Sequence, residues 1–346
     1  MERKEILLGK SPAELQQLCT ELGFPKFTAK QIALWLYGKK VRSMEAMTDL
    51  SAKNRLLLAE HAQIGCTEPL SKQSSQDGTR KFLFATQGTA QKSAPKSIES
   101  VYIPETDRAT LCVSCQSGCK MNCGFCATGS QGFNHSLQVH EILNQYYSIP
   151  ETDTVKNIVY MGMGEPFDNI DAVLKSLEVM TAPWGFAWSP YRITVSTVGI
   201  LPGLRRFLDE SSCHLALSLH NPFSEERALL MPMEKAYPVS EAIDLLHRYD
   251  WHGQRRVSFE YILMKDYNDG PLHAKAVVKL LQGLNCRVNL ISYHEVPGKP
   301  FRKSTSERTA RFQQILQESG IICTLRKSRG EDIMAACGLL AKTKGN

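Results

Sequence analysis

The 346-residue sequence contains no apolar run long enough to cross a lipid bilayer, which excludes an integral membrane protein built from spanning helices. Its beginning, "MERKEILLGKSPAELQQL", lacks the long apolar core of a secretory signal. Neither a sequence repeat nor a low-complexity tract is evident. Hydrophobic residues make up 42% of the chain and charged residues 22%, a balance typical of globular proteins. We therefore expect a soluble, cytoplasmic protein with no membrane partner.

The chain also lacks a strong excess of one charge. Its formal net charge is +6, with a sequence pI of about 8.7. This basic excess permits a nucleic-acid partner without establishing one, because many ordinary enzymes carry as much. Basic pairs recur, as at Arg205–Arg206 and Arg326–Lys327, but each pair alone is more typical of a solvated surface than of a phosphate contact.

Cysteine is the abundant residue that needs an explanation. The chain has eleven cysteines, and the cytosol keeps thiols reduced. Five are scattered among apolar neighbours and are expected to be small buried hydrophobic residues: Cys19, Cys66, Cys213, Cys286 and Cys323. Five others crowd into "TLCVSCQSGCKMNCGFCATG", residues 110–129: Cys112, Cys115, Cys119, Cys123 and Cys126.

Three regions are predicted along the chain. Residues 1–75 form a helical module that resembles an RNA-binding one, beginning with a helix capped by Ser11 with Pro12 in its first turn. Residues 76–104 form a β-hairpin linker, since "RKFLF" and "SIESVYI" flank a turn-rich stretch. Residues 105–346 alternate short β-branched strands with amphipathic helices, a pattern that demands a parallel sheet.

The strand count predicts an α/β fold with a partial, open (βα)6-type barrel rather than a closed barrel of eight strands. In such barrels the chemistry gathers where the parallel strands end. Polar and glycine-rich pieces follow the predicted strands here, and the cysteine cluster follows the first one. They are "GMGEP" (162–166), "STVG" (196–199), "SLHNP" (218–222), "YHEVPG" (293–298) and "AACG" (335–338). All are expected to face one mouth of the barrel.

Cys119, Cys123 and Cys126 form a C-x3-C-x2-C pattern. Three thiolates on one short loop can hold three irons of a [4Fe–4S] cluster and leave the fourth iron open for a small ligand. The alternative is a structural zinc site, which needs four closed ligands. The two C-x2-C pairs available for zinc are separated by a segment that is short for a zinc ribbon or finger, so the spacing favours iron and sulfur.

The cysteine pattern with Phe125 before its last cysteine resembles that of the radical S-adenosylmethionine (SAM) superfamily. The resemblance extends along nearly the whole chain to the RlmN/Cfr family of radical SAM RNA adenine methyltransferases, and more closely to its RlmN branch. It is carried, in order, by "FTAKQIALWLY", "MTDLS", "DGTRKFLF", "ESVYIP", "DRATLCVS", "CGFCATGSQGF", "MGMGEP", "ITVSTVG", "SLHNP", "KSRGEDI" and "AACG".

The resemblance implies two cofactors, one [4Fe–4S] cluster per chain and SAM. Cys119, Cys123 and Cys126 would hold the cluster, and its open iron would take the amino and carboxylate groups of SAM. The reduced cluster would cleave SAM to a 5′-deoxyadenosyl radical. The family's SAM contacts carry over to Gly164, Glu165, Ser196, Ser218, Leu219, His220 and His294.

The resemblance also implies three catalytic residues. Cys337 in "MAACG" would take a methyl group from one SAM, and the radical from a second SAM would abstract a hydrogen atom from that methyl. The resulting carbon radical would add to an adenine carbon and join protein and RNA covalently. Glu99 would remove the adenine proton, and Cys112 would resolve the adduct by forming a disulfide with Cys337. Without the resemblance, Cys337 reads as buried packing and Glu99 as an exposed strand carboxylate.

Two positions depart from the family's usual pattern. His294 stands where the family commonly has asparagine, and an imidazole differs from an amide in shape and charge. Cys115 stands where serine is common and does not fit the cluster spacing. We expect Cys115 to have no task in the chemistry.

The function expected from these features is methylation of an adenine ring carbon, C2, in 23S ribosomal RNA and in tRNA, with two SAM used per turnover. The alternatives are methylation of C8, a radical SAM enzyme with a diverged non-RNA substrate, and a non-catalytic RNA-binding module with a structural metal. The expected partners are RNA and an electron donor such as flavodoxin with its reductase, and the expected state is a monomer.

Overall fold

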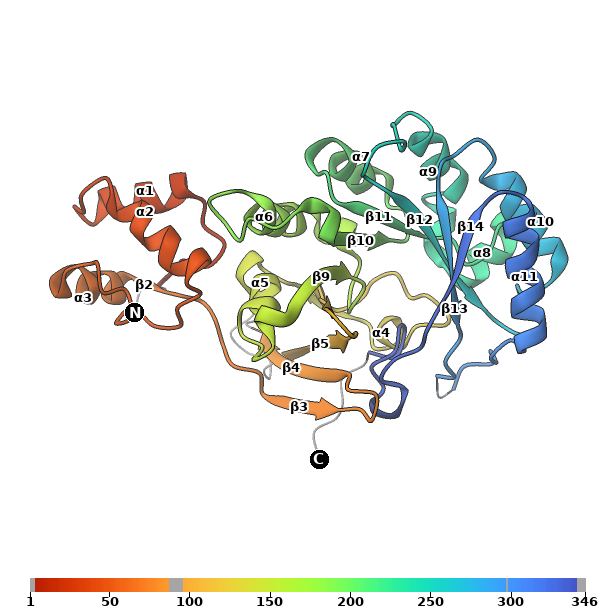
Figure 1. The fold of residues 1–346 in the computed structure, drawn as a ribbon, viewed down its shortest axis with the longest axis horizontal. Coiled ribbons are helices and arrows are strands. Elements are labelled where there is room, and N and C mark those ends of the chain that lie inside the picture. The colour runs from red at the N-terminus through yellow and green to blue at the C-terminus, as the bar shows by residue number, and fades with distance from the viewer. Residues whose placement is uncertain (1–3, 87–95, 297, 341–346) are drawn as a thin grey trace.

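The computed structural model describes residues 4–86, 96–296 and 298–340, and its centre is a ten-stranded sheet with helices packed around it (Figure 1). Across the sheet the strands follow the order β14-β13-β12-β11-β10-β9-β6-β5-β4-β3. The two edge strands do not pair with each other, so the sheet stays open as predicted. In the described part of the chain, no helix has the length and apolar character needed to span a membrane.

The N-terminal module is helical, with α1 (Pro12–Glu21), α2 (Thr28–Ala33) and α3 (Ala52–His61). The predicted cap of α1 is confirmed, because Ser11 Oγ accepts from the Glu14 amide while the Ser11 amide donates to the Glu14 carboxylate. A turn of π-helix, Leu34–Gly38, continues α2. The short parallel strands β1 (Glu5–Ile6) and β2 (Ala62–Gln63) pair the two ends of the module.

The predicted hairpin forms as β4 (Arg80–Thr86) and β5 (Lys96–Pro104), which pair antiparallel. The turn between them lies outside the described residues. The hairpin is part of the main sheet, because β5 also pairs antiparallel with β6 (Ala109–Cys112) and β3 (Ser71–Ser74) pairs with β4. Strand β5 therefore brings Glu99 into the same sheet as Cys112.

Seven parallel strands build the barrel. The predicted (βα)6-type barrel accounts for six of these strands, and β14 is the seventh. Each coincides with a predicted β-branched run: β6, β9 (Val155–Tyr160), β10 (Ile193–Thr197), β11 (His214–Ser218), β12 (Val257–Leu263), β13 (Arg287–Ser292) and β14 (Ile322–Arg326).

Helices connect successive strands on the outside of the sheet (Figure 1). The predicted alternation of helices with strands is confirmed by α5 (Val139–Tyr147), α6 (Ile170–Thr181), α7 (Leu201–Glu210), α8 (Ser224–Leu230), α9 (Val239–Leu246), α10 (Pro271–Leu280) and α11 (Ser306–Glu318). Two short antiparallel strands, β7 (Gln116–Gly118) and β8 (Phe133–Ser136), lie on either side of residues 119–126, which we call the cysteine loop, and of the one-turn helix α4 (Ala127–Ser130).

The N-terminal module packs on the barrel through aromatic side chains. Tyr37 meets Trp184 and Phe186 edge-on, with ring centroids 5.7 and 5.4 Å apart. Four of the five scattered cysteines are buried as predicted. The prediction is wrong for Cys66, which is half-buried where the chain passes from the module to the barrel.

Candidate active site

The cysteine loop follows β6 and is held by backbone hydrogen bonds to distant segments. The Gly124 amide donates to the Leu230 carbonyl (2.7 Å), and the Ala127 amide donates to the Gly338 carbonyl (2.8 Å). The Thr128 hydroxyl donates to the Leu340 carbonyl (2.6 Å). The loop is thereby tied to the C-terminal segment that carries Cys337.

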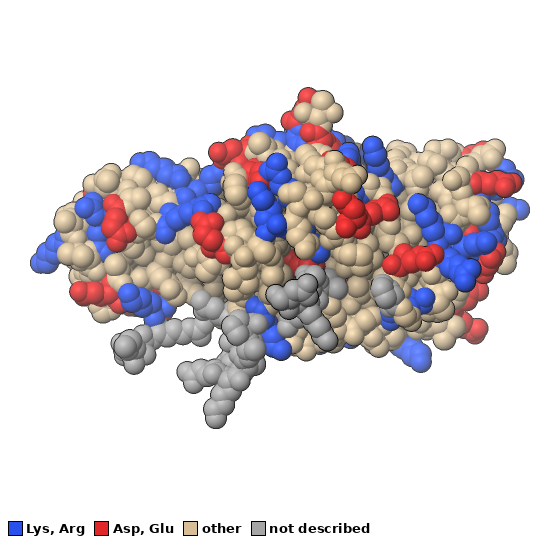
Figure 2. Space-filling model, turned by 90° about the horizontal axis from the view of Figure 1, so that it is seen from below, with Lys and Arg blue, Asp and Glu red and all other residues tan. Residues whose placement is uncertain are grey.

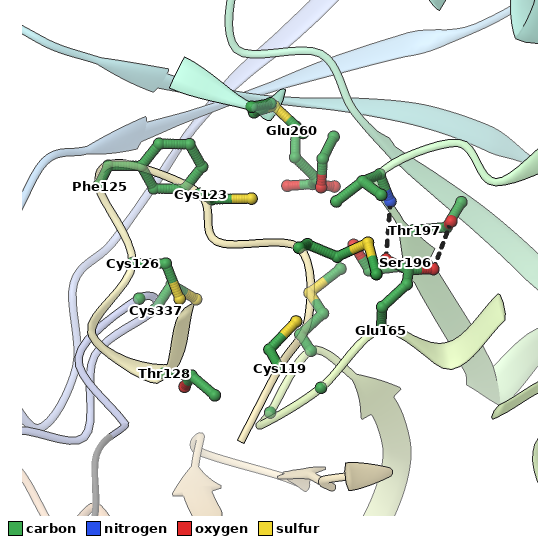
Figure 3. A pocket seen from close by; sticks show the side chains of 18 of the residues that line it. Cys119, Cys123, Phe125, Cys126, Thr128, Glu165, Ser196, Thr197, Glu260 and Cys337 are labelled. Carbon is green, nitrogen blue, oxygen red and sulfur yellow. Dashed lines mark hydrogen bonds between the residues drawn. The ribbon is translucent and has the colours of Figure 1, made fainter. Parts of the chain in front are cut away.

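A cavity of about 150 Å³ opens between this loop and the carboxyl ends of the strands; we call it the barrel cavity. The predicted convergence at one mouth of the barrel is confirmed, since most of the predicted positions line it. The lining includes Cys119, Cys123, Cys126, Gly164, Glu165, Ser196, Ser218, His220 and Cys337. Figure 3 shows the three thiols of the loop on one side and the strand ends on the other.

Gly164 and Glu165 shape the wall that follows β9. Gly164 has a φ of +101°, and a Cβ there would lie 2.5 Å from the Gln116 Cβ, so only glycine fits. The Glu165 carboxylate accepts from the Phe167 amide (3.0 Å), the Thr197 hydroxyl (2.6 Å) and the Val198 amide (2.9 Å). Burial raises the pKa of Glu165 to about 7, although these donors oppose the rise. This carboxyl group therefore locks the ends of β9 and β10 together.

His220 is fixed as a neutral ring. Its Nδ1 accepts from the Ile262 amide (3.1 Å), which leaves the proton of the neutral tautomer on Nε2. Burial, followed by the nearby charge of Arg227, lowers the pKa of His220 to about 3. The Arg227 guanidinium is fully buried, pairs with Glu234, and donates to the carbonyls of Val198 (3.0 Å), Ser218 (2.8 Å) and Leu219 (3.0 Å). Through these hydrogen bonds, Arg227 holds the ends of β10 and β11 together.

The three thiols suit a polynuclear cluster better than a single ion. Among residues 4–86, 96–296 and 298–340, no three His, Cys, Asp or Glu side chains converge closely enough to hold one metal ion. A zinc site needs four such donors at about 2.0–2.3 Å from one centre. Cys119, Cys123 and Cys126 instead stand around a cavity (Figure 3), as ligands to separate irons must. Burial raises the pKa of Cys119 to about 12, so its thiolate requires a bound cation.

A second cavity of about 340 Å³ lies beside the first; we call it the cysteine-pair cavity because both Cys112 and Cys337 line it. Cys337 also lines the barrel cavity, so it stands on the wall that the two cavities share. Its side chain has a large exposed area although protein surrounds it, since solvent reaches it through these hollows. Cys112, at the end of β6, is buried.

The loop carrying Cys337 is held from the side of β3 and β4. Asp332 accepts from the Ser75 hydroxyl (2.6 Å) and from the Gln76 amide (3.2 Å). The Gly330 amide donates to the Asp77 carboxylate (3.1 Å). The turn before β4 therefore positions the C-terminal loop beside the cysteine loop.

Comparisons with known proteins agree with this geometry. The model of the radical SAM superfamily matches residues 113–276, and the model of the ribosomal RNA large subunit methyltransferase N-terminal domain matches residues 6–64. A protein from Phocaeicola vulgatus, described as a probable dual-specificity RNA methyltransferase RlmN, is 53% identical over 99% of this chain and 96% of its own length. The chain belongs to the RlmN family of radical SAM RNA methyltransferases.

Further relatives agree. The dual-specificity RNA methyltransferase RlmN of Syntrophobacter fumaroxidans is 40% identical over 96% of both chains. A crystal structure of a radical SAM methyltransferase from Sphaerobacter thermophilus superposes with a TM-score of 0.90 at 38% identity, covering 97% of this chain and 99% of that one. As a radical SAM enzyme of the RlmN family, the protein uses a [4Fe–4S] cluster and SAM.

Besides Cys112, three residues predicted from the family pattern do not line the barrel cavity. Leu219 is fully buried and takes part through its backbone, whose amide donates to the Glu260 carbonyl (3.0 Å). His294 lines the cysteine-pair cavity, where its Nε2 is bonded to the Ser328 hydroxyl and its Nδ1 lies 3.7 Å from the Glu331 carboxylate. Glu99 lines neither cavity. It is only 1% exposed and pairs with Lys81 at 3.0 Å, so its reading as an exposed carboxylate is wrong.

Cys115 also lies away from the cavities in which the reaction is expected to take place. Its thiol is buried and lines neither the barrel cavity nor the cysteine-pair cavity. Its backbone pairs with Met163 and Leu137. These contacts give it a packing role and leave the C-x3-C-x2-C thiols as the ones that face the barrel cavity.

Iron content tests this division of the cysteines. Anaerobically prepared wild-type protein is expected to be brown and to hold about four irons per chain. Cys123→Ala should lose most of this iron, because the cluster loses one of its three protein ligands. The matched variant Cys115→Ser should keep wild-type iron and absorbance. Loss of iron from Cys115→Ser, or full iron in Cys123→Ala, would contradict the assignment.

The position of His294 leads to a second prediction. Because its ring faces the cysteine-pair cavity and both nitrogens have protein partners, His294→Asn should change the dissociation constant for SAM by less than about threefold. Ser196→Ala, which alters the barrel cavity itself, should weaken SAM binding by about five- to tenfold. Both constants can be measured by equilibrium dialysis. A marked loss in His294→Asn alone would assign His294 to the SAM site.

Two residues that face these cavities were missed from the sequence. Glu260 lines the barrel cavity from the middle of β12, and Arg326 lines the cysteine-pair cavity from the end of β14. The two side chains pair across the wall at 3.1 Å. The signal for Glu260 was a single carboxylate in the apolar run "RVSFEYILM", which a buried strand does not admit without a reason.

Proposed function

We propose that this protein methylates carbon C2 of an adenine in 23S ribosomal RNA and in tRNA, through a methylated Cys337 and a covalent protein–RNA adduct. The observation that carries the proposal is the position of Cys337 on the wall shared by two cavities. A residue that receives a methyl group in one place and delivers it in another requires such a position. The names of the relatives, dual-specificity RNA methyltransferases, support RNA as the substrate.

The barrel cavity would bind SAM with its amino and carboxylate groups toward Cys119, Cys123 and Cys126. When bound there and reduced, the cluster supplies the electron that cleaves SAM to methionine and a 5′-deoxyadenosyl radical. Ser196 and Ser218 offer hydroxyl groups to the ligand, and His220 offers its Nε2 proton. Glu165 and Arg227 keep the strand ends that carry these groups in place.

Cys337 would accept the methyl group and later carry it to the RNA. Burial raises the pKa of its thiol, and the guanidinium of Arg326 offsets part of that rise by favouring the thiolate. An aromatic ring carbon is a poor nucleophile for direct transfer from SAM. A radical on the methyl carbon of Cys337 can add to it. Loss of one electron, which the oxidised cluster would accept, and of the ring proton would then restore the aromatic ring and leave the base bound to the protein through sulfur and one carbon.

Cys112 would release the product. Its thiol shares a cavity with Cys337, and Cys337 is close enough to help raise the pKa of Cys112. Attack of the Cys112 thiolate on the Cys337 sulfur would form a disulfide; the electron pair of the broken sulfur–carbon bond stays on the carbon, which takes up a proton and becomes the methyl group of the RNA. Burial raises the pKa of Cys112, so deprotonation of this thiol is a step that the site must assist.

Glu99 would take the proton from the adenine carbon. It is buried against Lys81, whose ammonium group compensates its charge inside the sheet. Because Glu99 does not line the cysteine-pair cavity, this role requires the RNA-bound enzyme to bring the base and this carboxylate together. The role stands on the family pattern and on the place of β5 beside β6.

RNA would enter from the side of the cysteine-pair cavity. Arg326, Lys327 and Arg329 line it and can offer positive charge to phosphate groups. On the face shown in Figure 2, basic and acidic side chains intermingle, so the excess of basic residues does not form one continuous patch there. A cytoplasmic monomer that receives electrons from flavodoxin and its reductase completes the proposal.

The second candidate is methylation of C8 of the same ribosomal adenine, and a diverged non-RNA substrate is a third. The match of residues 6–64 to the N-terminal domain of ribosomal RNA methyltransferases supports an RNA substrate over the third candidate, and the RlmN names of the relatives support C2 over C8. Mass spectrometry of adenosines from the RNA of a knockout strain and its complemented strain tests this. We expect 2-methyladenosine to disappear and return; 8-methyladenosine or no change would overturn the proposal.

A further inference from the structure

Glu260 carries a carboxylate oxygen that the protein leaves without a partner. The side chain is 3% exposed and extends from β12 into the barrel cavity (Figure 3). Its Oε1 accepts from the Ser258 hydroxyl (3.1 Å), the Asn289 amide (2.9 Å) and the Arg326 guanidinium (3.1 Å). Its Oε2 has no hydrogen-bond partner within the described chain. A buried polar atom of this kind is costly and is rarely left unsatisfied without a function.

The three donors to Oε1 fix the orientation of the Glu260 carboxylate and therefore the position of Oε2. Ser258, Asn289 and Arg326 all donate to Oε1, so Oε2 is the carboxylate oxygen left for a ligand in the barrel cavity that Glu260 lines. An ionised carboxylate only accepts hydrogen bonds. Its ligand must therefore present a hydroxyl or an amine.

The sheet places Glu260 in a polar row. In the parallel register, Glu260 lies directly opposite Ser218 on β11 and Asn289 on β13. Ser218 also lines the barrel cavity. Glu260 therefore belongs to the same ligand-binding surface as a residue already expected to contact SAM.

The nearness of Glu260 to Cys337 indicates which part of SAM reaches this oxygen. Under the proposed function, the amino and carboxylate groups of SAM lie at the cluster, and the C5′ atom lies beside Cys337. Glu260 is close enough to Cys337 for its charge to act on that thiol. The group next to C5′ is the ribose, whose hydroxyls are the nearest donors, whereas the adenine amine lies at the far end of the nucleoside.

Resting on the proposed function, we propose that Oε2 of Glu260 accepts a hydrogen bond from a ribose hydroxyl of SAM. Arg326 is the positioning residue behind it, since it holds Oε1 from the cysteine-pair cavity. The pair thereby connects the SAM site to the cysteine-pair cavity, which both Cys112 and Cys337 line.

Glu260→Gln is the sharp test. The amide oxygen can replace Oε1 and keep its three donors, which places an NH2 group where Oε2 was and turns an acceptor into a donor. For the cluster-loaded enzyme, the dissociation constant for SAM should rise by about 10- to 100-fold, the effect of losing a hydrogen bond to a charged group. Iron content should stay at the wild-type value, which shows that the variant folds.

Ligand analogues separate contact from structure. Wild-type enzyme should bind 2′-deoxy-SAM or 3′-deoxy-SAM more weakly than SAM by a similar factor, whereas Glu260→Gln should bind SAM and that analogue equally well. The matched control Ser258→Ala removes one donor to Oε1 but leaves Oε2, and should shift the constant by less than about threefold.

Three outcomes would overturn the inference. The first is an unchanged SAM affinity in Glu260→Gln, and the second is an equal loss of affinity in Ser258→Ala. The third is that Glu260→Gln weakens the binding of each deoxy analogue by the same factor as it weakens the binding of SAM. A cluster-loaded wild type that binds no SAM would overturn both this inference and the proposed function. The binding measurements do not depend on RNA methylation. An enzyme that binds SAM as expected but leaves RNA unmethylated in a separate assay would therefore contradict the proposed function alone.

Discussion

Cys337→Ala is expected to abolish both methyl loading of the protein and methylation of RNA. Among the described residues, Cys337 is the one thiol that lines both cavities. Removing a group that forms a covalent intermediate typically lowers turnover on the order of 10⁴-fold or more. Incubation with methyl-labelled SAM, followed by denaturation, should leave no label on the variant protein.

The control for this experiment is Cys66→Ala, which removes a half-buried thiol that lines neither cavity. It should load methyl groups like the wild type. SAM binding and iron content should survive in Cys337→Ala, because its neighbours Cys119, Cys123 and Cys126 are untouched. If the Cys337→Ala protein still acquires label, the methyl carrier lies elsewhere and the covalent route fails.

Cys112→Ala is expected to stop turnover at the covalent intermediate. The variant keeps the barrel cavity and Cys337, so the methyl carbon can still reach the base. Without the Cys112 thiol, the sulfur–carbon bond to RNA has no resolving partner in the cysteine-pair cavity. A band that carries both protein and RNA should accumulate on a denaturing gel, while released product falls by about 10³-fold or more.

Cys115→Ala is the matched control for the adduct. Cys115 is a neighbour of Cys112 in the sequence but is buried and does not line the cysteine-pair cavity. It should turn over normally and show no shifted band. If an adduct formed in Cys115→Ala, or none in Cys112→Ala, the roles of the two thiols would have to be exchanged or abandoned.

Much of the fold could be predicted because each element carries a local signal. The capping box of Ser11 and Glu14 and the β-branched runs of the seven parallel strands act over a few residues. The rule that parallel strands end at one mouth also predicted that Glu165, Ser196 and Ser218 would meet. The sequence pattern therefore sufficed for these residues of the barrel cavity, but not for Glu260.

The remainder depends on contacts between distant segments. Glu99 is buried because β4 supplies Lys81 across the pair of strands, and no local pattern distinguishes that from an exposed carboxylate. His294 faces the second cavity because of the loop near Ser328. The free oxygen of Glu260 follows from three donors on three strands. Whether a buried polar group has a hydrogen-bond partner can be seen only in the three-dimensional structure.

The central claim is that Cys337 carries the carbon that joins an adenine, and the trapped adduct tests it most directly. The Cys112→Ala protein, reacted with RNA, is digested with protease and nuclease, and the cross-linked peptide is sequenced by mass spectrometry. We expect the peptide containing Cys337 to carry one adenosine, attached at C2 through a single carbon derived from SAM. A cross-link at another residue, or an adenosine attached without that carbon, would contradict the account.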